Sequence, residues 1–338
     1  MTAGARGALR RAGAGAVAAG LLVPVAATGA AADDVKSTVV FRVTDPRITE
    51  ASGLAVSARH PGVLYTHNDS GGQPVIYALG PDGRTRATLR LAGATARDWE
   101  AMATGRDERG RPCVFVADIG DNLGGAWPYV TVYRIPEPAE LRSQTVRATA
   151  FRFKYEDGPR NAETMMIDPR TNRLYIASKL FGASLYAAPP KLRTRGFNTL
   201  RKVGGAPAIA TDGAFAPDGR SFVIRTYFGA RLYTMKPDGK PGKSLGSLAL
   251  PAQKQGESIT YTRDGTAVLV GSEGSDQPVY RVPLDPELRP AAPSPSTSPR
   301  KDTKAEDGRL DASGRRVALA LILGIAALVG YGLVRRKS

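Results

Sequence analysis

One pattern of strands and turns recurs five times between residues 34 and 289, and this repetition constrains the fold more than any other feature. Each unit begins with a polar residue and a short apolar strand. A turn rich in Pro, Asp, Gly or Asn, a β-rich strand, an aromatic-centred strand and a more polar strand follow. The five units start at Ser52–Ala55, Glu100–Ala103, Glu163–Met166, Asp212–Phe215 and Glu257–Thr260. Four strands repeated every roughly 45 to 63 residues are typical of β-propeller blades.

The fifth unit has no fourth strand after residues 278–284, whereas the apolar run at residues 37–43 stands alone before the first unit. An N-terminal strand that completes the last blade would close the ring and leave no open sheet edge. The sequence therefore predicts an all-β, five-bladed propeller over residues 33–289, closed by an N-terminal strand. A six-bladed ring, with one blade not recognised, is the alternative.

The two ends of the chain predict export and a membrane anchor. Residues 1–32 carry Arg6, Arg10 and Arg11, then a small apolar stretch and an Ala-rich cleavage site, as a signal peptide does. General secretion and twin-arginine export both stay open. Residues 317–334 form an uncharged apolar run long enough for a transmembrane helix.

The segments around this helix predict its orientation. Residues 290–316, rich in Pro, Ser and charge, predict a disordered stalk. The basic tail at residues 335–338 places the C-terminus in the cytoplasm by the positive-inside rule. We therefore predict a single-pass protein of the cell membrane, with its propeller outside and its C-terminus cytoplasmic.

The charge of the chain limits its possible binding partners, and its cysteine content limits its disulfides. The net charge is +16 at pH 7, but a chain with an export signal does not meet nucleic acid, so we predict no such partner. A basic outer surface can instead meet an anionic small molecule or a cell-wall component. The single cysteine, Cys113, excludes an intrachain disulfide.

The polar residue before each inner strand is acidic in four of the five units. Equivalent positions of successive blades surround one opening, so these carboxylates should crowd together. Crowded like charges are costly unless a cation answers them. A hard cation such as Ca²⁺, which prefers oxygen ligands, would fit there. The alternative is that each acid caps a turn or pairs with an Arg. The predicted metal ligands at these positions are Glu100, Glu163, Asp212 and Glu257.

A second polar set follows the next strand of each unit. Oxygen-rich residues follow it in the first, second and fifth units, whereas the third and fourth units have cations. A metal that faces cations could hold a phosphate or a carboxylate. The predicted further metal ligands are Asp69, Asp118 and Asp121, and the predicted ligand-binding residues are Asn68, Asn122, Lys179, Arg225 and Glu273.

Candidate catalytic groups are few. Of the two histidines, His67 lies in the second polar set and is the candidate imidazole base, whereas His60 lies in a turn. The sequence has no G-x-S-x-G, H-E-x-x-H or C-x-x-C motif. This absence argues against a serine hydrolase, a zinc peptidase of that type and a dithiol redox protein.

The strings SGLAVS, HPGVLYTHNDSGG, ATARDWEAMA, VADIGDN and VYRIPEP, between residues 52 and 138, resemble a group of secreted bacterial β-propeller proteins, most of them without an assigned activity. More distantly, residues 38 to 285 look like calcium-dependent phytase-like, quinoprotein glucose dehydrogenase-like and YWTD propellers. The resemblance implies a propeller fold.

Three hypotheses for function follow. The first is a membrane-anchored module that binds a cation and, in addition, an extracellular ligand or wall component. The second is a calcium-dependent hydrolase of phosphate or other anionic esters, for which the carboxylates and cations of the opening are the suitable groups. The third is a quinone-dependent sugar dehydrogenase, for which His67 would be the base and Arg225 would face the quinone.

Overall fold

The computed structural model describes residues 35–69 and 71–289, which contain twenty-one strands and one 3₁₀ turn, η1 (Pro286–Leu288). The all-β prediction is therefore confirmed. The predicted signal peptide, stalk, transmembrane helix and tail lie outside the described residues. Among the helical segments that are described, none is long and apolar enough to cross a bilayer.

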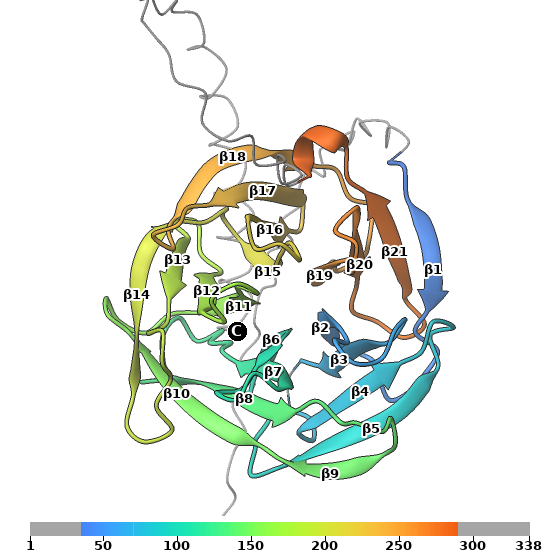
Figure 1. Ribbon diagram of the computed structural model, residues 1–338, viewed down its shortest axis with the longest axis horizontal. Coiled ribbons are helices and arrows are strands. Elements are labelled where there is room, and N and C mark those ends of the chain that lie inside the picture. The colour runs from blue at the N-terminus through green and yellow to red at the C-terminus, as the bar shows by residue number, and fades with distance from the viewer. Residues whose placement is uncertain (1–34, 70, 290–338) are drawn as a thin grey trace, which may run out of the picture. The chain divides into compact units, whose positions relative to one another are not determined.

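The strands form antiparallel groups of four, each running from the centre of the molecule outward (Figure 1). The innermost strands are β2 (Ala51–Val56), β6 (Trp99–Arg106), β11 (Ala162–Ile167), β15 (Ala210–Phe215) and β19 (Ser258–Tyr261). The second strands are β3 (Leu64–Asn68), β7 (Pro112–Asp118), β12 (Leu174–Ser178), β16 (Ser221–Thr226) and β20 (Ala267–Gly271).

The third strands are β4 (Val75–Leu79), β8 (Val130–Pro136), β13 (Ser184–Ala187), β17 (Gly229–Met235) and β21 (Pro278–Pro283). The outermost strands are β5 (Thr85–Ala92), β10 (Thr149–Tyr155), β14 (Asn198–Gly205), β18 (Pro241–Leu248) and β1 (Thr38–Arg42). Each innermost strand contacts the innermost strands of its two neighbours, and β19 contacts β2. The arrangement is therefore a closed, propeller-like ring.

The ring closes through the first strand of the described chain. β1 pairs antiparallel with β21, with Thr38 opposite Arg281 and Arg42 opposite Pro278. The N-terminal strand therefore completes the last group, as the sequence predicts. Because β1 supplies the missing outer strand, β21 has no unpaired edge.

Two parallel pairings link neighbouring groups at the outer edge of the ring, and the repeat pattern did not predict them. β9 (Gln144–Arg147) adds to β5, and β10 pairs with β14, so that two groups share one eight-stranded sheet. The amide of Asn198 adds a hydrogen bond to the carbonyl of Arg152, 3.1 Å away. These pairings cover backbone groups that an outer strand would otherwise expose.

Burial follows the position of a strand in its group. All six residues of β11 are buried, because an innermost strand packs on both faces. In β5 the buried residues alternate with partly or fully exposed ones, since one face packs on the next group and the other meets solvent.

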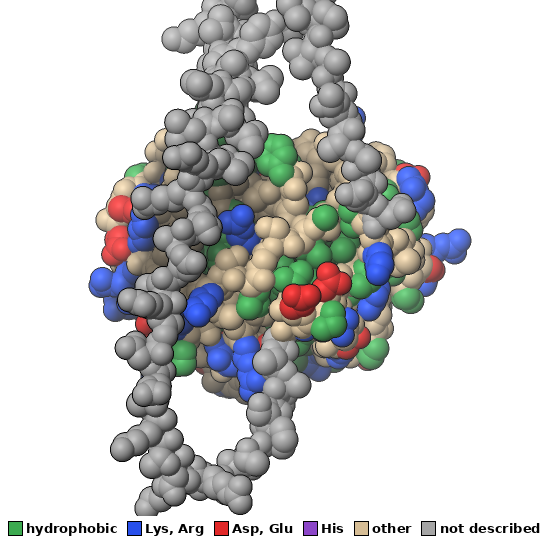
Figure 2. Space-filling model, turned by 90° about the horizontal axis from the view of Figure 1, so that it is seen from above, with side chains coloured by type: hydrophobic (Ala, Val, Ile, Leu, Met, Phe, Trp, Pro, Cys, Tyr) green, Lys and Arg blue, Asp and Glu red, His purple; other side chains and the backbone are tan. Residues whose placement is uncertain are grey.

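Figure 2 shows Lys and Arg side chains dispersed over one outer face of the molecule instead of gathered into a single patch.

A buried glutamate joins the first two groups. The carboxylate of Glu137 follows β8 and accepts hydrogen bonds from the Ser57 hydroxyl at 2.5 Å, the Ala58 amide at 3.1 Å and the Tyr65 hydroxyl at 3.1 Å. Hydrogen bonds to a charged group are among the stronger ones in proteins. Glu137 therefore connects the turn after β2 to the neighbouring group.

Replacing Tyr65 with phenylalanine keeps the ring in the core but removes one donor from this carboxylate. We expect the free energy of unfolding to fall by about 1 kcal/mol, because the other donors remain. Urea denaturation of both proteins measures the difference. A neutral or stabilising change would contradict a contribution of the hydroxyl at this joint.

Candidate metal and ligand site

The beginning of an innermost strand carries one extra residue that has no cross-strand partner. In β2, β6, β11 and β15 the pairing register shifts at this point, and the residues that fall in the shift are Ser52, Glu100, Glu163 and Thr211. Such bulges re-aim a side chain out of the regular ladder. In the last group Glu257 holds the corresponding place, directly before the first pair of β19.

This register corrects one position in the alignment of the five sequence repeats. The alignment put Asp212 beside Glu100 and Glu163 because it is acidic, but Thr211 occupies that position, and Asp212 pairs with Arg225 one step further along the strand. The Asp212 carboxylate is buried and accepts a hydrogen bond from the Ile259 amide at 2.8 Å. It therefore joins β15 to β19 and does not stand with the glutamates.

The five positions divide by chemistry. The hydroxyls of Ser52 and Thr211 donate to backbone carbonyls of the next group, those of Glu100 at 2.9 Å and Gly256 at 3.2 Å. The other three are carboxylates, and each of them is at least nine-tenths buried. They are Glu100, Glu163 and Glu257.

Asp69, Asp98 and Glu100 converge at one side of the opening. One carboxylate oxygen of each lies within 4.8 Å of the others. Asp69 follows β3 and Asp98 precedes β6, and the Trp99 amide donates to the Asp69 carbonyl at 3.1 Å, which holds the two segments together. A Cβ at Gly120 would overlap Asp98 Oδ2 and Glu100 Oε1, so only glycine leaves room for both carboxylates.

The carboxylates of the opening hold protons unusually strongly. Burial raises the pKa of Asp69 to about 8, and the negative charges of Asp98 and Glu273 add to the rise. Burial, with the negative charge of Glu163 next in effect, raises the pKa of Glu100 well above its ordinary value. Burial also raises the pKa of Glu273 to about 7. Burial is the main cause of these shifts, and the neighbouring carboxylates add to it.

The positive charge of Lys179 balances part of this negative charge. Its ammonium group donates to Glu163 Oε1 at 2.5 Å and to the Tyr227 hydroxyl at 2.8 Å, and that hydroxyl donates to Glu257 Oε1 at 2.9 Å. Burial lowers the pKa of Lys179, but Glu163 outweighs that effect, so the pKa is raised and the lysine stays charged. Even with this partner, burial raises the pKa of Glu163 to about 8.

Two predicted metal ligands, Asp121 and Asp118, accept hydrogen bonds from backbone amides of the loops around the opening. Both carboxylate oxygens of Asp121 accept backbone amides of its own loop, from Ala126 at 3.1 Å and Trp127 at 2.8 Å. Asp118 lies 3.5 Å from the Arg97 guanidinium and accepts the Asp98 amide at 3.1 Å. These two aspartates shape the site: both oxygens of Asp121 and Oδ1 of Asp118 already have partners.

The predicted ligands Asn68, Asn122 and Arg225 also form hydrogen bonds within the protein. Asn68 accepts the Glu50 amide at 3.2 Å, and exposed Asn122 accepts from Asn161 at 3.2 Å. Arg225 is buried and donates to the carbonyls of Ser258 at 2.8 Å and Gly271 at 3.0 Å, and to Gln253 Oε1 at 2.7 Å. Arg225 therefore joins two groups of strands, and Lys179 is the cation that faces the glutamates.

His67 is completely buried. Its Nδ1 lies 2.9 Å from the Asn68 carbonyl, which requires a proton on Nδ1, and its ring meets the Trp99 ring edge-on with 5.7 Å between centroids. Burial lowers the pKa of His67 to about 4, so the imidazole is neutral at physiological pH. The geometry gives it a packing role beside the acidic cluster.

Sequence reasoning missed Asp98 and Tyr227. Asp98 lies two residues before Glu100, outside the aligned position, but its neighbourhood in the string DWE could have indicated it. Tyr227 follows β16 in a turn, outside the repeated strand positions. Its side chain is partly exposed and bridges Lys179 and Glu257.

The donor set of the opening suits a hard divalent cation. All candidate ligands are oxygens, as Ca²⁺ and Mg²⁺ require. Three buried carboxylate oxygens at the opening have no hydrogen-bond partner among the described residues: Asp69 Oδ1, Glu163 Oε2 and Glu257 Oε2. Buried acceptors without partners are costly, and a bound cation would satisfy them.

Comparisons with known proteins add little to this description. No protein-family model matches the sequence, and no curated protein is similar to it. Among solved structures, XC5397 from Xanthomonas campestris, described as a gluconolactonase, is 15% identical with a TM-score of 0.45, over 70% of this chain and 72% of that one. The protein U3-55K is 14% identical with a TM-score of 0.39, over 69% of this chain and 68% of that one.

Proposed function

We propose that this protein binds a divalent cation, Ca²⁺, through Asp69, Asp98 and Glu100, and that the loaded site holds an anionic extracellular ligand. The convergence of these three carboxylates within 4.8 Å carries the proposal. Their raised pKa values support it, because burial and neighbouring carboxylates both disfavour the charged forms unless a cation is bound. The negative charges of Glu163 and Glu257 also act on the trio, since Glu163 raises the pKa of Glu100 and Glu257 raises that of Asp69.

Lys179 gives the loaded site its preference for anions. Its ammonium group is held by Glu163 and Tyr227, and its charge acts on Glu100 and Asp98 of the trio. A phosphate or carboxylate could contact the metal with one oxygen and the lysine with another. A cell-wall polymer or a small organic anion outside the cell has this chemistry.

The proposed setting is the outer face of the cell membrane, with residues 317–334 as the anchor. It rests on the terminal sequences. We also propose that the ring is a five-bladed propeller. The five innermost strands, each in contact with its two neighbours, support this count over the six-bladed alternative.

Thermal unfolding of the full-length protein in EDTA and in millimolar Ca²⁺ or Mg²⁺ tests the cation site. At a Ca²⁺ concentration of 100 times Kd, we expect Tm to rise by about 5–10 °C, because ligand binding to the native state adds about 2.7 kcal/mol. Glu100→Gln should abolish this rise and leave the EDTA sample at least as stable as the wild type, since the amide removes a poorly balanced charge.

Glu140→Gln is the matched control. Glu140 is exposed and pairs with Arg142 at 3.4 Å, so the variant should keep the full Ca²⁺ response. The proposal fails if no cation raises Tm, or if the rise persists in Glu100→Gln.

A second candidate function is metal-dependent hydrolysis of a phosphate or other anionic ester. Glu163 favours it, because a carboxyl with a pKa of about 8 beside a lysine can take up or release a proton near neutral pH. Release of p-nitrophenol from its phosphate ester, with Ca²⁺ and with EDTA, measures the activity. A hydrolase should lose turnover in Glu163→Gln while the Ca²⁺ response of Tm remains. The same turnover in EDTA would exclude a metal-dependent reaction.

The quinone-dependent dehydrogenase has no such support. That reaction needs a histidine base and an arginine that meet the cofactor, but both His67 and Arg225 are buried. The Arg225 guanidinium already donates to two carbonyls and one side-chain amide.

A further inference from the structure

A second binding cavity lies at the other end of the innermost strands from the acidic opening. Its volume is about 400 Å³, and the last residues of β2, β6, β11, β15 and β19, with the turns after them, line it. The strands run from the opening at their first residues to this cavity at their last ones. A cavity of this size can enclose a small organic molecule.

The chemistry of this cavity is opposite to that of the opening. Its inner wall is apolar, with Leu54, Met102, Met166 and Phe215 among its lining residues. None of the described residues that line it is a carboxylate, whereas Arg106 and Arg263 both belong to the lining. The cavity therefore suits a molecule with an apolar body and a negative charge.

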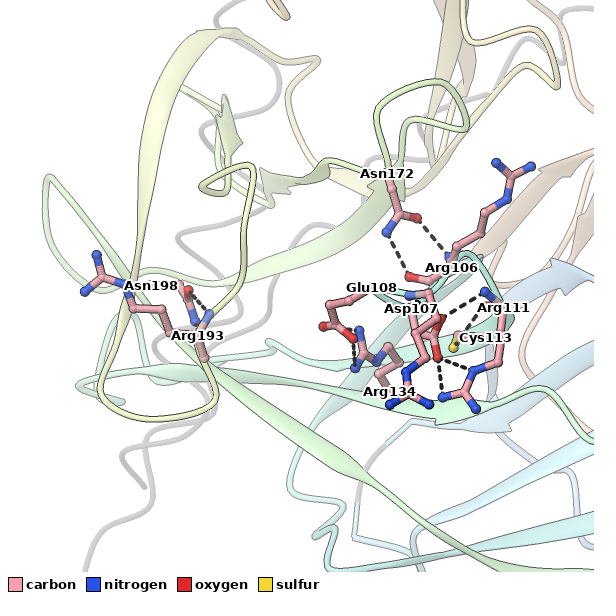
Figure 3. Close-up of polar contacts among 10 residues, drawn as sticks. Arg106, Asp107, Glu108, Arg111, Cys113, Arg134, Asn172, Arg193 and Asn198 are labelled. Carbon is pink, nitrogen blue, oxygen red and sulfur yellow. Dashed lines mark hydrogen bonds and ion pairs between the residues drawn. The ribbon is translucent and has the colours of Figure 1, made fainter.

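Arg106 is the cation that remains available. Asn172 fixes its backbone, because the Arg106 amide donates to Asn172 Oδ1 at 2.9 Å and Asn172 Nδ2 donates to the Arg106 carbonyl at 2.8 Å (Figure 3). Its guanidinium extends away from these contacts (Figure 3) and has no hydrogen bond or ion pair with another described residue. Held at its backbone and free at its tip, the side chain can turn toward a ligand.

The acids that follow Arg106 in the chain are already paired. Asp107 accepts the Arg111 guanidinium at 2.6 Å and the Arg109 amide at 2.9 Å. Glu108 binds the Arg134 guanidinium at 2.8 Å (Figure 3). Neither carboxylate neutralises Arg106, so its charge is available at the edge of the cavity.

Arg263 adds a second, fixed cation. Its guanidinium donates to the Ser57 carbonyl at 2.5 Å, and this bond holds the charge near the turn after β2. A hydrogen bond to a carbonyl leaves the positive charge uncompensated, since a carbonyl is neutral. The two arginines come from the second and fifth groups of the ring and belong to one lining.

We propose that this cavity binds a small organic anion, with its apolar body against Met102, Met166 and Leu54 and its acidic group on Arg106. This site is separate from the proposed cation site, because its residues and its sign of charge differ. Methionine side chains adapt to varied apolar shapes, so the cavity would accept a range of such anions.

Fluorescence titration with anilinonaphthalene sulfonate, an apolar anion, tests the proposal on the full-length protein in EDTA. We expect saturable binding with one high-affinity site. Arg106→Gln should weaken it about tenfold or more, as loss of a charge-assisted bond does. Ala214→Phe, which fills the cavity from β15, should abolish it. Arg142→Gln, at an exposed arginine on the outside of the ring, should bind the dye as the wild type does.

Tm measurements on each variant establish that it is folded. If Arg106→Gln binds the dye as tightly as the wild type, the proposed contact between Arg106 and the negative charge of the ligand is wrong, even if Ala214→Phe blocks binding. Binding that survives both substitutions, or no saturable binding at all, would overturn the cavity as a site. Because the titration is done in EDTA, neither result depends on the proposed cation site.

Discussion

Replacing Trp99 with alanine is expected to lower the free energy of unfolding by about 3–5 kcal/mol. Trp99 is completely buried, and its indole N–H donates to the Thr95 carbonyl at 2.8 Å. Its ring contacts His67 and Tyr133, so the cavity left behind would open between the first two groups of strands.

The same substitution should also weaken the proposed cation site. Trp99 stands between Asp98 and Glu100 in the chain, and its amide binds the Asp69 carbonyl. Loss of the ring frees the segment that aims all three carboxylates. We therefore expect a smaller Ca²⁺ response than in the wild type, beyond the loss of stability.

Trp127 offers the matched control, since the chain has only two tryptophans. It lies half-buried in the loop before β8, where Arg97 stacks on its ring at 4.4 Å. Trp127→Ala should cost about 1 kcal/mol or less, as removal of an exposed cation–π contact does. Urea denaturation of both variants measures the comparison. Equal losses for the two would contradict the structural role given to Trp99.

The metal-free protein should become less stable as the pH rises from 6.5 to 8.5. Asp69 and Glu163 each have a pKa of about 8 in the folded state, so they hold protons there. On unfolding their pKa values return to about 4, and both groups release their protons. The folded state therefore binds more protons, and the free energy of unfolding falls with pH in this range. We expect Tm in EDTA to fall by about 5–10 °C.

Saturating Ca²⁺ should reduce this dependence, because the cation replaces the proton of Asp69. The Ca²⁺-induced rise in Tm should then grow with pH. The range starts at 6.5 because His67, with its pKa lowered to about 4, contributes the opposite slope below that value. A Tm in EDTA that is constant or rises with pH would contradict the predicted protonation, and Glu163→Gln should reduce the slope.

The repeat pattern predicted the order of strands because blade-forming residues recur with the same polarity and turn chemistry. The run at residues 37–43 was recognised as the closing strand for the same reason, and β1 lies there. The parallel pairing of β10 with β14 was not predictable, since it joins polar outer strands whose sequences carry no pairing signal.

The site was predictable in kind and less so in detail. Glu100, Glu163 and Glu257 stand where the alignment placed them, since each precedes the regular part of an innermost strand. Asp212 was misplaced because one bulge residue, Thr211, shifts the register and a sequence alone does not show which residue leaves the ladder. The loop oxygens of Asp121 were assigned to a metal, yet nearby amides use them.

The pairing of β1 with β21 also sets an order of events for folding. Thr38 meets Arg281, so the contact that locks the ring joins segments near opposite ends of the folded region. A contact of such long range forms late, because the chain between its partners must first be brought together. A chain truncated before residue 278 would keep an open strand edge at one end of an incomplete ring. Such a fragment is prone to associate with other chains.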